Sequence, residues 1–580
     1  MLCSIPSKLI AKTTRKLSRR RSRILMTLKS KYPPLEVPEC NILSFVFPAG
    51  RKPSEKPTWI DANDPSNSLS LADMLSWVKR FAAGLDVLGV GQGETIMVFT
   101  PNHIFVPVAY LATAGSKRIF TGANPAYTVD EVAYQMKIIR AAVVLIHPSL
   151  LRQGLAAAKQ AQIPISRVFQ FSSVECPVQN GVRDWRDITT MASTTEAQSW
   201  QWDTLRRHRS QNTIAAVNFS SGTTGLPKGV CISHYNLVSN AIQNLANKFH
   251  NTGCSETDPG PERWLATLPL YHAYAQLWTI TIASRLQASV YIMSKFVFED
   301  YLRHIEKYNI TTLQVVPPIL LMLNKRPETA KYKLHSLQTI LCGAAPLSPA
   351  VQTEVSQRLG VVVVQGWGMT ETTCAGIMIP GRMVEDTGSI GYLLPNTEAL
   401  LLDEEENEVT NDGKPGELLL RGPQVMLKYW ENEIATKETL TPDGWLRTGD
   451  VAVVEDGKFW IVDRKKELIK VNGLQVAPAE LEAILLLHQD IVDAAVTGIR
   501  FQDDEWPRAY VVRREHSQTT EAEVREFVAT KVAKHKRLSG GIMFVPEIPK
   551  LASGKIIRKQ LREWSKRDAK EMGGIMRSSL

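Results

Sequence analysis

Short apolar runs rich in β-branched residues alternate with longer helical patterns through most of this 580-residue chain. Thr95–Phe99, Ala141–Ile146, Val168–Phe171 and Val361–Val364 are runs of the first kind, and Leu69–Leu88 has the helical pattern. Strands that are apolar throughout need cover on both faces, and strands separated by helices pair in parallel. The sequence therefore predicts an α/β fold with mostly parallel sheets covered by helices.

The length and a change of composition near Asp463 predict more than one domain. A chain of 580 residues exceeds what one hydrophobic core usually supports. A lysine-rich segment and then a smaller βαβ-like region follow Asp463. We expect a basic N-terminal extension at 1–26, a large N-terminal domain at 27–462 and a small α+β C-terminal domain at 463–580.

Most of the excess positive charge lies at the N-terminus. Residues 1–25 hold eight basic residues and no acidic residue, which leaves +2 of the net charge of +10 for the rest of the chain. A nearly neutral body argues against a nucleic-acid-binding protein. The extension has the composition of a mitochondrial transit peptide or of a helix on an anionic membrane surface. A solvated tail, or a true start at Met26, are the other interpretations.

The remaining global features indicate an intracellular protein. The seven cysteines are scattered and form no C-x-x-C pair, which predicts reduced thiols and no zinc site. No run approaches the roughly twenty apolar residues of a membrane span. The C-terminal Ser578-Ser579-Leu580 differs at its middle position from the Ser-Lys-Leu peroxisomal signal. Cytoplasm, peroxisome and mitochondrion all stay open as compartments.

The most specific local pattern is a loop of glycines and hydroxyls after the apolar run Ile214–Val217. Glycines let the backbone approach a ligand, and successive N–H groups and hydroxyls make a concavity for phosphate oxygens. The lysine follows a proline and precedes a glycine, unlike the lysine of the usual P-loop. The pattern predicts a site for the phosphates of ATP, formed by Ser220, Ser221, Gly222, Thr223, Thr224, Gly225 and Lys228.

This loop resembles the phosphate loop of the adenylate-forming family, which includes acyl- and aryl-CoA ligases, luciferases and peptide-synthetase adenylation domains. Further motifs occur in the family's order, so the resemblance spans roughly residues 30 to 565. It implies that a carboxylic acid attacks the α-phosphorus of Mg·ATP, pyrophosphate leaves, and a thiol then displaces AMP. The implied small molecules are ATP, Mg²⁺, CoA and a carboxylic acid.

The resemblance implies roles for residues at the ends of several strands. His272 in Leu-Pro-Leu-Tyr-His would orient the acid's carboxylate, and Glu371 in Gly-Trp-Gly-Met-Thr-Glu would hold Mg²⁺. Trp367, where the family usually has tyrosine, would stack on adenine. Further nucleotide contacts are implied for Ala345, Gln365, Gly366, Thr370, Asp450 and Arg464. The acyl pocket would be lined by Tyr274, Trp278, Gly343, Gly368 and Met378.

Residues after Asp463 would act in two different arrangements of the small domain. Lys555, in Ser-Gly-Lys, would reach the carboxylate and the α-phosphate during adenylation only. Lys470, Gly473 and Gln475 would face the active site during thioester formation, with Gly473 and Lys295 against CoA. Asp463-Arg464 resembles the family's hinge, so the small domain is expected to be mobile.

The motifs Gly-Trp-Gly-Met-Thr-Glu and Gln-Val-Ala-Pro-Ala-Glu are similar to those of 4-coumarate–CoA ligases and their fungal acyl-CoA ligase relatives. The resemblance implies a CoA ligase for an aryl or medium-to-long acyl acid, with a place in secondary metabolism. One alternative is an enzyme that loads a carrier protein. A second is a membrane-surface binding protein with a vestigial nucleotide site, against which the intact Lys228, Lys555 and Glu371 argue.

Overall fold

The computed structural model describes residues 27–220, 227–409, 413–471, 474–501, 504–551 and 554–578. The basic extension and the last two residues lie outside the described residues, so the targeting signals proposed for them stay predictions. Within the described ranges, no helix combines the length and the apolar character needed to cross a membrane. The six cysteines in these ranges are free thiols, as the sequence predicts.

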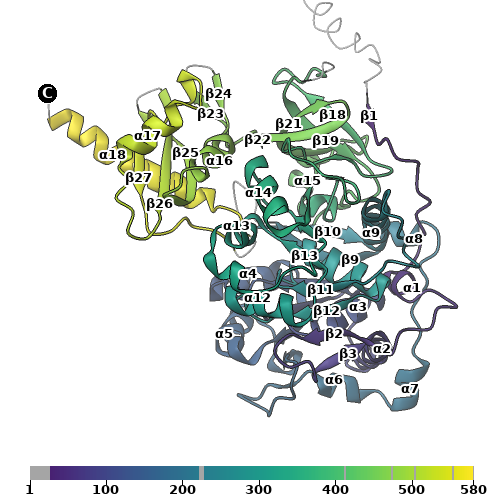
Figure 1. Cartoon of the computed structure of the whole chain (residues 1–580). Coiled ribbons are helices and arrows are strands. Elements are labelled where there is room, and N and C mark those ends of the chain that lie inside the picture. Colours follow the sequence, from purple (N-terminus) through teal and green to yellow (C-terminus); the bar gives the residue numbers. More distant parts are fainter. Residues whose placement is uncertain are drawn as a thin grey trace, which may run out of the picture.

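Two large sheets form the body of the molecule (Figure 1). The eight-stranded sheet has the order β20 (Lys428–Tyr429), β10 (Lys228–Ser233), β9 (Ile214–Ser220), β5 (Ile119–Ala123), β4 (Thr95–Phe99), β6 (Ala141–Ile146), β7 (Val168–Gln170) and β8 (Arg183–Asp184). The nine-stranded sheet has the order β17 (Tyr392–Leu393), β16 (Ile377–Met378), β15 (Val362–Trp367), β14 (Thr339–Cys342), β13 (Thr312–Val315), β11 (Arg263–Ala266), β12 (Ser289–Ile292), β2 (Pro57–Asp61) and β3 (Ser68–Ser70). The central strands of both sheets pair in parallel, which confirms the predicted fold class.

Successive residues of β4 belong to two different hydrophobic cores. Ile96 and Val98 pack in the large core shared by the two sheets, whereas Met97 and Phe99 pack in a second core on the outer face. Helices α4 (Val129–Ile138) and α5 (Leu151–Gln160) cover that outer face. The large core takes side chains from α2 (Leu71–Val87), α3 (Val106–Gly115), α9 (His234–Phe249), α12 (Phe298–Lys307), α13 (Pro317–Lys325) and α14 (Pro349–Leu359). The continuous apolar runs therefore reflect burial on both faces.

A capping box sets the start of α2. The Ser70 hydroxyl accepts from the backbone N–H of Asp73, and the Asp73 carboxylate accepts from that of Ser70. This arrangement satisfies N–H groups that the first turn leaves free. The predicted helix, Leu69–Leu88, therefore begins two residues too early.

A third sheet of five strands is antiparallel, which the sequence analysis does not anticipate. Its order is β1 (Leu28–Lys29), β18 (Glu398–Leu402), β19 (Gly416–Arg421), β21 (Leu446–Glu455) and β22 (Lys458–Arg464). Its strands share a small core of their own. Runs such as Leu418–Leu420 are as apolar as those of the parallel strands, so composition alone does not separate the two kinds of sheet.

The chain after β22 forms a separate body, at the upper left of Figure 1. It contains the hairpin β23 (Ile469–Val471) and β24 (Leu474–Val476), a three-stranded sheet of β25 (Ile491–Phe501), β26 (Asp504–Arg513) and β27 (Ile542–Phe544), and helices α16 (Pro478–Leu486), α17 (Glu521–Ala529) and α18 (Arg558–Ser578). Its hydrophobic core contains no residue from the large sheets. The Lys325 ammonium of α13 joins the two bodies by donating to the Leu486 carbonyl at 2.9 Å.

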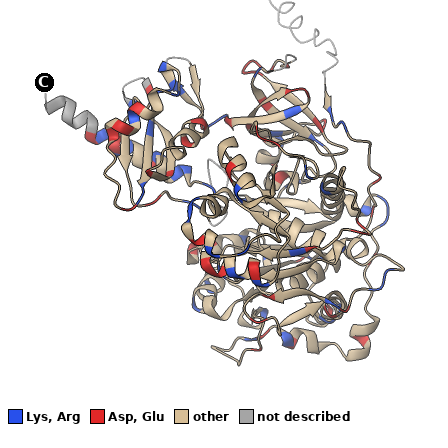
Figure 2. Cartoon of the chain, in the orientation of Figure 1, with Lys and Arg blue, Asp and Glu red and all other residues tan. Residues whose placement is uncertain are grey.

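Positive and negative side chains alternate over the described residues. Figure 2 shows Lys and Arg interleaved with Asp and Glu along the outer helices and loops, with no single basic region in this view. In this view the distribution agrees with the nearly neutral body expected from the sequence.

Candidate active site

A pocket opens where the carboxyl ends of β14 and β15 meet the loop after β11. This is the edge of a parallel sheet where α/β proteins bind ligands. Ten of the predicted site residues line it: His272, Tyr274, Trp278, Gly343, Gly366, Trp367, Gly368, Thr370, Met378 and Lys555. They come from segments almost 300 residues apart along the chain, so the fold alone brings them together.

Trp367, Asp450 and Arg464 form a connected row beside the pocket. The indole N–H of Trp367 donates to Asp450 Oδ2 at 2.8 Å, and Arg464 Nε lies 3.5 Å from Asp450 Oδ1. Burial raises the pKa of Asp450, and the charge of Arg464 and the indole hydrogen bond oppose that rise. The Asp450 carboxylate, which the resemblance assigns to nucleotide binding, is thus held in one orientation.

Lys555 enters the pocket from the C-terminal body. Its loop closes on itself through two bonds, Gly554 N–H to the Leu551 carbonyl and Leu551 N–H to the Lys555 carbonyl, both at 2.8 Å. Gly554 has a φ of +77°, and a Cβ there would lie 3.0 Å from Pro318 at the start of α13. Among the described residues, no carboxylate lies within ion-pair distance of the Lys555 ammonium. The pocket therefore offers an unpaired cation to an anionic ligand.

The pH dependence of the reaction should report on this lysine. Burial and the nearby Arg464 lower the pKa of Lys555 from 10.5, while Glu371, Asp450 and Glu467 oppose the shift. We expect acid-dependent pyrophosphate release to fall as the pH rises through this lowered pKa, because the ammonium is lost. In Lys555→Arg, whose guanidinium stays charged, the fall should move to higher pH in assays from about pH 7 to 10. An unchanged alkaline limb would assign it to another group.

His272 stays neutral at physiological pH. It caps the short helix α10 (Ala273–Ala275), where its Nδ1 accepts from the Tyr274 N–H at 3.3 Å, so the neutral ring carries its proton on Nε2. Burial, and then the charge of Lys555, lower its pKa to about 4. A neutral imidazole can donate a hydrogen bond to a carboxylate without adding a charge.

The two ends of the predicted phosphate loop meet in the structure. Ser220 and Lys228 are register partners on β9 and β10. Ser221, Gly222, Thr223, Thr224 and Gly225 lie outside the described residues. The Lys228 ammonium lies 4.9 Å from the centre of the Tyr429 ring, and the Tyr429 hydroxyl donates to Glu371 Oε1 at 2.8 Å. Lysine, tyrosine and carboxylate therefore stand in a row at the loop.

Glu371 is the one predicted metal ligand. It is 5% exposed, and the described residues contain no group of three or more His, Cys, Asp or Glu that could hold a metal ion by themselves. Mg²⁺ is commonly held by one or two carboxylates together with substrate phosphates and water. A single buried carboxylate beside the phosphate loop fits that kind of site.

Other predicted residues lie outside the pocket. The Gln365 amide donates to Gln352 of α14, whose own amide donates to the Val363 carbonyl at 3.0 Å, and Ala345 follows the lining residue Ala344. Lys470 and Gln475 are register partners on the hairpin β23–β24. Both contact Glu404, Gln475 at 2.6 Å and Lys470 at 3.8 Å. Gly473 lies outside the described residues.

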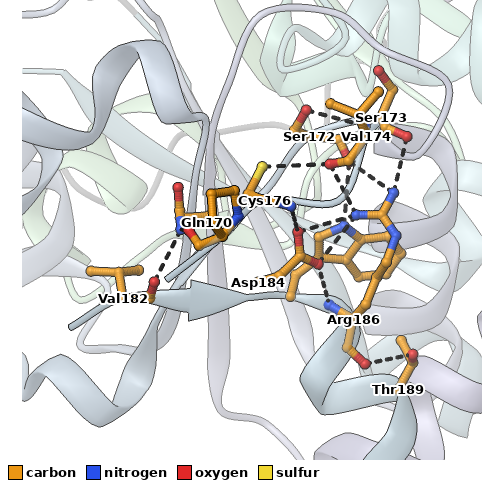
Figure 3. A network of polar contacts seen from close by, with 11 residues as sticks. Gln170, Ser172, Ser173, Val174, Cys176, Val182, Asp184, Arg186 and Thr189 are labelled. Carbon is orange, nitrogen blue, oxygen red and sulfur yellow. Dashed lines mark hydrogen bonds and ion pairs between the residues drawn. The ribbon is translucent and has the colours of Figure 1, made fainter. Parts of the chain in front are cut away.

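Lys295 lies in a second cavity, of about 310 Å³, at the carboxyl ends of β2, β4, β6, β7 and β12. Polar groups from each of these ends line it: Asp61, Asn102, His103, His147, Ser173 and Ser294. Figure 3 shows how Arg186 holds the loop that carries Ser173, donating to the Ser173 carbonyl at 2.9 Å and to Asp184 at 3.1 and 3.2 Å. These hydrogen bonds therefore fix the loop around Ser173, which forms part of the wall of this cavity.

Local sequence does not mark two contacts that support the site. Asn218 of β9 and Gln276 exchange hydrogen bonds of 2.8 and 3.0 Å, and Gln276 also donates to the Tyr271 carbonyl. This pair ties the strand before the phosphate loop to the segment that carries His272. The hydrogen bond from Tyr429 to Glu371 is the second such contact, because Tyr429 comes from the edge strand β20, outside the recognised motifs.

Gly368 is the position where the site most clearly requires glycine. A Cβ at this residue would lie 1.6 Å from the Cys374 carbonyl oxygen, a distance that no packing adjustment of side chains can relieve. The backbone at Gly368 therefore lies directly against the backbone at Cys374, and this contact shapes the wall of the pocket.

Comparison with known proteins shows the family to which the chain belongs. A family model described as AMP-binding enzyme matches residues 47–430, and one described as AMP-binding enzyme C-terminal domain matches residues 480–555. The phenylacetyl-CoA ligase epaB of Aspergillus niger is 37% identical over 92% of this chain and 98% of its own. A probable 4-coumarate–CoA ligase of Dictyostelium discoideum is 34% identical over 92% and 97%.

Solved structures show the same fold. The ATP-bound MatB of Rhodopseudomonas palustris superposes with a TM-score of 0.79 at 26% identity, over 91% of this chain and 99% of its own. An anthranilate CoA ligase with bound anthranoyl-AMP superposes with a TM-score of 0.82 at 24% identity, over 92% and 99%. The chain therefore belongs to the AMP-binding enzyme family, the ATP-dependent adenylate-forming ligases that its motifs resemble.

Proposed function

We propose that this protein is an ATP-dependent, AMP-forming carboxylic acid–CoA ligase that uses the pocket around Lys555 for both half-reactions. The observation that carries the proposal is the unpaired Lys555 ammonium, which lies in one pocket with His272, Thr370 and Trp367. The carboxylate of the substrate and the α-phosphate of ATP are both anions and must meet in the pocket, and Lys555 supplies the positive charge that they need there.

In the first half-reaction the acid's carboxylate attacks the α-phosphorus of ATP and pyrophosphate leaves. Both reactants are anions, so catalysis depends on positioning and on neutralising charge. His272 donates from Nε2 to the carboxylate, Thr370 donates to the α-phosphate, and Lys555 lies between them. Asp450 and Arg464 hold the ribose, Trp367 stacks on the adenine, and Lys228 with its hydroxyl loop receives the leaving pyrophosphate.

Glu371 would hold Mg²⁺ at the phosphates. When bound, the ion neutralises part of the phosphate charge and makes pyrophosphate a better leaving group. The Tyr429 hydroxyl donates to one oxygen of Glu371, which fixes the direction of the other. The geometry of this chain thus prepares the carboxylate before any ligand binds.

In the second half-reaction the thiol of CoA attacks the acyl group and AMP leaves. In the structure Lys470 and Gln475 contact Glu404, while Lys555 lies in the pocket. The pair Lys470 and Gln475 therefore cannot act in the pocket at the same time as Lys555. We propose a large domain at 27–462 and a cap at 463–580 that turns about Asp463 and Arg464, at the end of β22. The turn withdraws Lys555 and brings in Lys470, Gly473 and Gln475, while Lys295 receives CoA.

The acyl side of the pocket supports an aryl or medium-to-long acyl acid. Tyr274, Trp278 and Met378 line it, and the Tyr274 hydroxyl is engaged with the Leu341 carbonyl at 2.9 Å. The similarity to an Aspergillus niger phenylacetyl-CoA ligase supports an aryl acid.

Pyrophosphate release and thioester formation, measured separately, test the function. Purified protein with Mg·ATP is given a panel of aryl and fatty acids, with and without CoA. We expect acid-dependent pyrophosphate release and a CoA-dependent thioester. Adenylate formation without thioester would indicate that the acceptor is a carrier protein and not CoA. ATP binding without any turnover across the panel would contradict the proposed ligase activity.

The indole hydrogen bond to Asp450 gives a separate prediction. Trp367→Phe keeps an aromatic ring but removes the N–H that orients the carboxylate. A hydrogen bond to a charged group contributes about 1.5–3 kcal/mol, so we expect KM for ATP to rise about tenfold or more. The change in kcat should be smaller, because the bond is made before and during the reaction alike. An unchanged KM for ATP with normal thermal unfolding would show that Asp450 needs no orienting donor.

A further inference from the structure

The side chain of Gln314, in the middle of β13, has no hydrogen-bond partner among the described residues. It is 2% exposed, and both its amide oxygen and its amide nitrogen are buried without a partner. Buried side-chain amides are almost always hydrogen-bonded in native proteins, since desolvation without compensation is costly. A buried amide with both ends free therefore indicates a group that binds there.

The register of the sheet places Gln314 on the face that forms the pocket. Gln314 pairs with Leu341 of β14, and partners in a parallel ladder project to the same face. Leu341 lines the pocket, and its carbonyl accepts from Tyr274. On the other side, Trp264 of β11 pairs with Thr312, two residues before Gln314, and therefore shares this face. The Trp264 ring centre lies 6.2 Å from that of the pocket residue Trp278.

The same strand gives the depth of Gln314 below the reacting groups. Val316 follows two residues later, and a Cβ on Gly554 would lie 3.3 Å from its Cγ2. Val316 therefore stands at the level of Lys555, where the carboxylate of the acid is placed. Two residues of strand span about 7 Å. Gln314 thus lies about one aromatic ring below the carboxylate.

The surroundings of Gln314 restrict the chemistry of its partner. On the acyl side the pocket is lined by Trp278, Leu341, Ala375 and Met378, none of which can hydrogen-bond through a charged group. A carboxamide both donates and accepts, as a hydroxyl does. A distal carboxylate or ammonium would meet no opposite charge here.

We propose that Gln314 is a specificity-determining residue that selects acids carrying a neutral hydrogen-bonding group, such as a hydroxyl, about one ring length from the carboxylate. This inference rests on the ligase function proposed above and names its substrate class. A site built to hydrogen-bond a substrate hydroxyl rejects the analogue that lacks it, because the protein amide then stays unpaired.

Matched pairs of acids test the selection. Phenylacetic and 4-hydroxyphenylacetic acid, cinnamic and 4-hydroxycinnamic acid, and octanoic and 8-hydroxyoctanoic acid are compared by kcat/KM for pyrophosphate release. In the wild-type enzyme we expect the hydroxylated acid to be preferred at least tenfold in one or more pairs. In Gln314→Leu, which keeps the volume but removes the amide, the preference should fall to unity or reverse. Gln352→Leu removes another buried amide, on the other side of the sheet at α14, and should keep the wild-type preference.

Binding of stable acyl-sulfamoyl adenosine analogues, with and without the distal hydroxyl, gives a readout that needs no turnover. Wild type should bind the hydroxylated analogue at least tenfold more tightly, and Gln314→Leu should not. Equal preference in wild type and Gln314→Leu, with turnover intact, would overturn the role of Gln314 and leave the ligase function standing. Failure of both analogues to bind the wild type would overturn the ligase function and this inference with it.

Discussion

Lys555→Ala should slow adenylation about 10²–10³-fold and spare thioester formation. The ammonium is the cation that the C-terminal body contributes to the pocket, and no carboxylate among the described residues pairs with it. Removing one preorganised charge from a developing transition state typically costs about 10²–10³ in rate. We expect a loss of that size in acid-dependent pyrophosphate release, while conversion of a supplied acyl-adenylate and CoA to the thioester stays within about threefold of wild type.

Lys550→Ala is the matched control for this variant. Lys550 lies in the same segment but turns to Asp493, with 2.6 and 2.7 Å between its ammonium and the two carboxylate oxygens. It should change adenylation by no more than about twofold, since Lys550 is not among the residues that line the pocket and its partner Asp493 lies in the C-terminal body. Equal losses in both variants would point to the folding of the segment instead of the charge of Lys555. A Lys555→Ala enzyme with normal adenylation would remove Lys555 from the mechanism.

How far the sequence predicts the fold depends on whether local pattern and burial agree. The bounds of β4 and β6 match the predicted runs, because the apolar residues of these strands pack in one of two cores. The antiparallel sheet of β18, β19, β21 and β22 was not predicted. Its strands are equally apolar, and only their antiparallel pairing distinguishes them.

The candidate site likewise contains residues that the sequence predicts and contacts that it does not. Motif residues such as His272, Trp367 and Lys555 could be placed in one pocket from the resemblance, because each motif holds its residue at the end of a strand or in a loop. The indole bond from Trp367 to Asp450 joins residues 83 positions apart, and nothing near either residue predicts it. The local sequence does not mark Gln314 either, since only the register of β13 against β14 shows that it shares a face of the sheet with the pocket residue Leu341.

A variant of Lys470 can distinguish the second half-reaction from the first, because of where this residue lies. In the structure Lys470 is on the exposed hairpin β23–β24, where its ammonium lies 3.8 Å from Glu404 and outside the pocket. An exposed pair of this kind contributes about 0–1 kcal/mol, so the loss of the side chain should leave folding and adenylation almost unchanged. If the cap turns as proposed, the same lysine becomes part of the site that receives CoA.

We therefore expect Lys470→Ala to release pyrophosphate in the first turnover at a rate within about twofold of wild type, while thioester formation falls about 10²-fold, the scale on which a lost positioning contact acts. One equivalent of acyl-adenylate should accumulate on the enzyme, which rapid quench and chromatography would detect. Glu404→Gln is the matched control, because it loosens the contact of both Lys470 and Gln475 without altering either side chain. It should retain both half-reactions. Parallel losses of both half-reactions in Lys470→Ala would contradict the alternation, since a residue used only after the turn cannot slow the step before it.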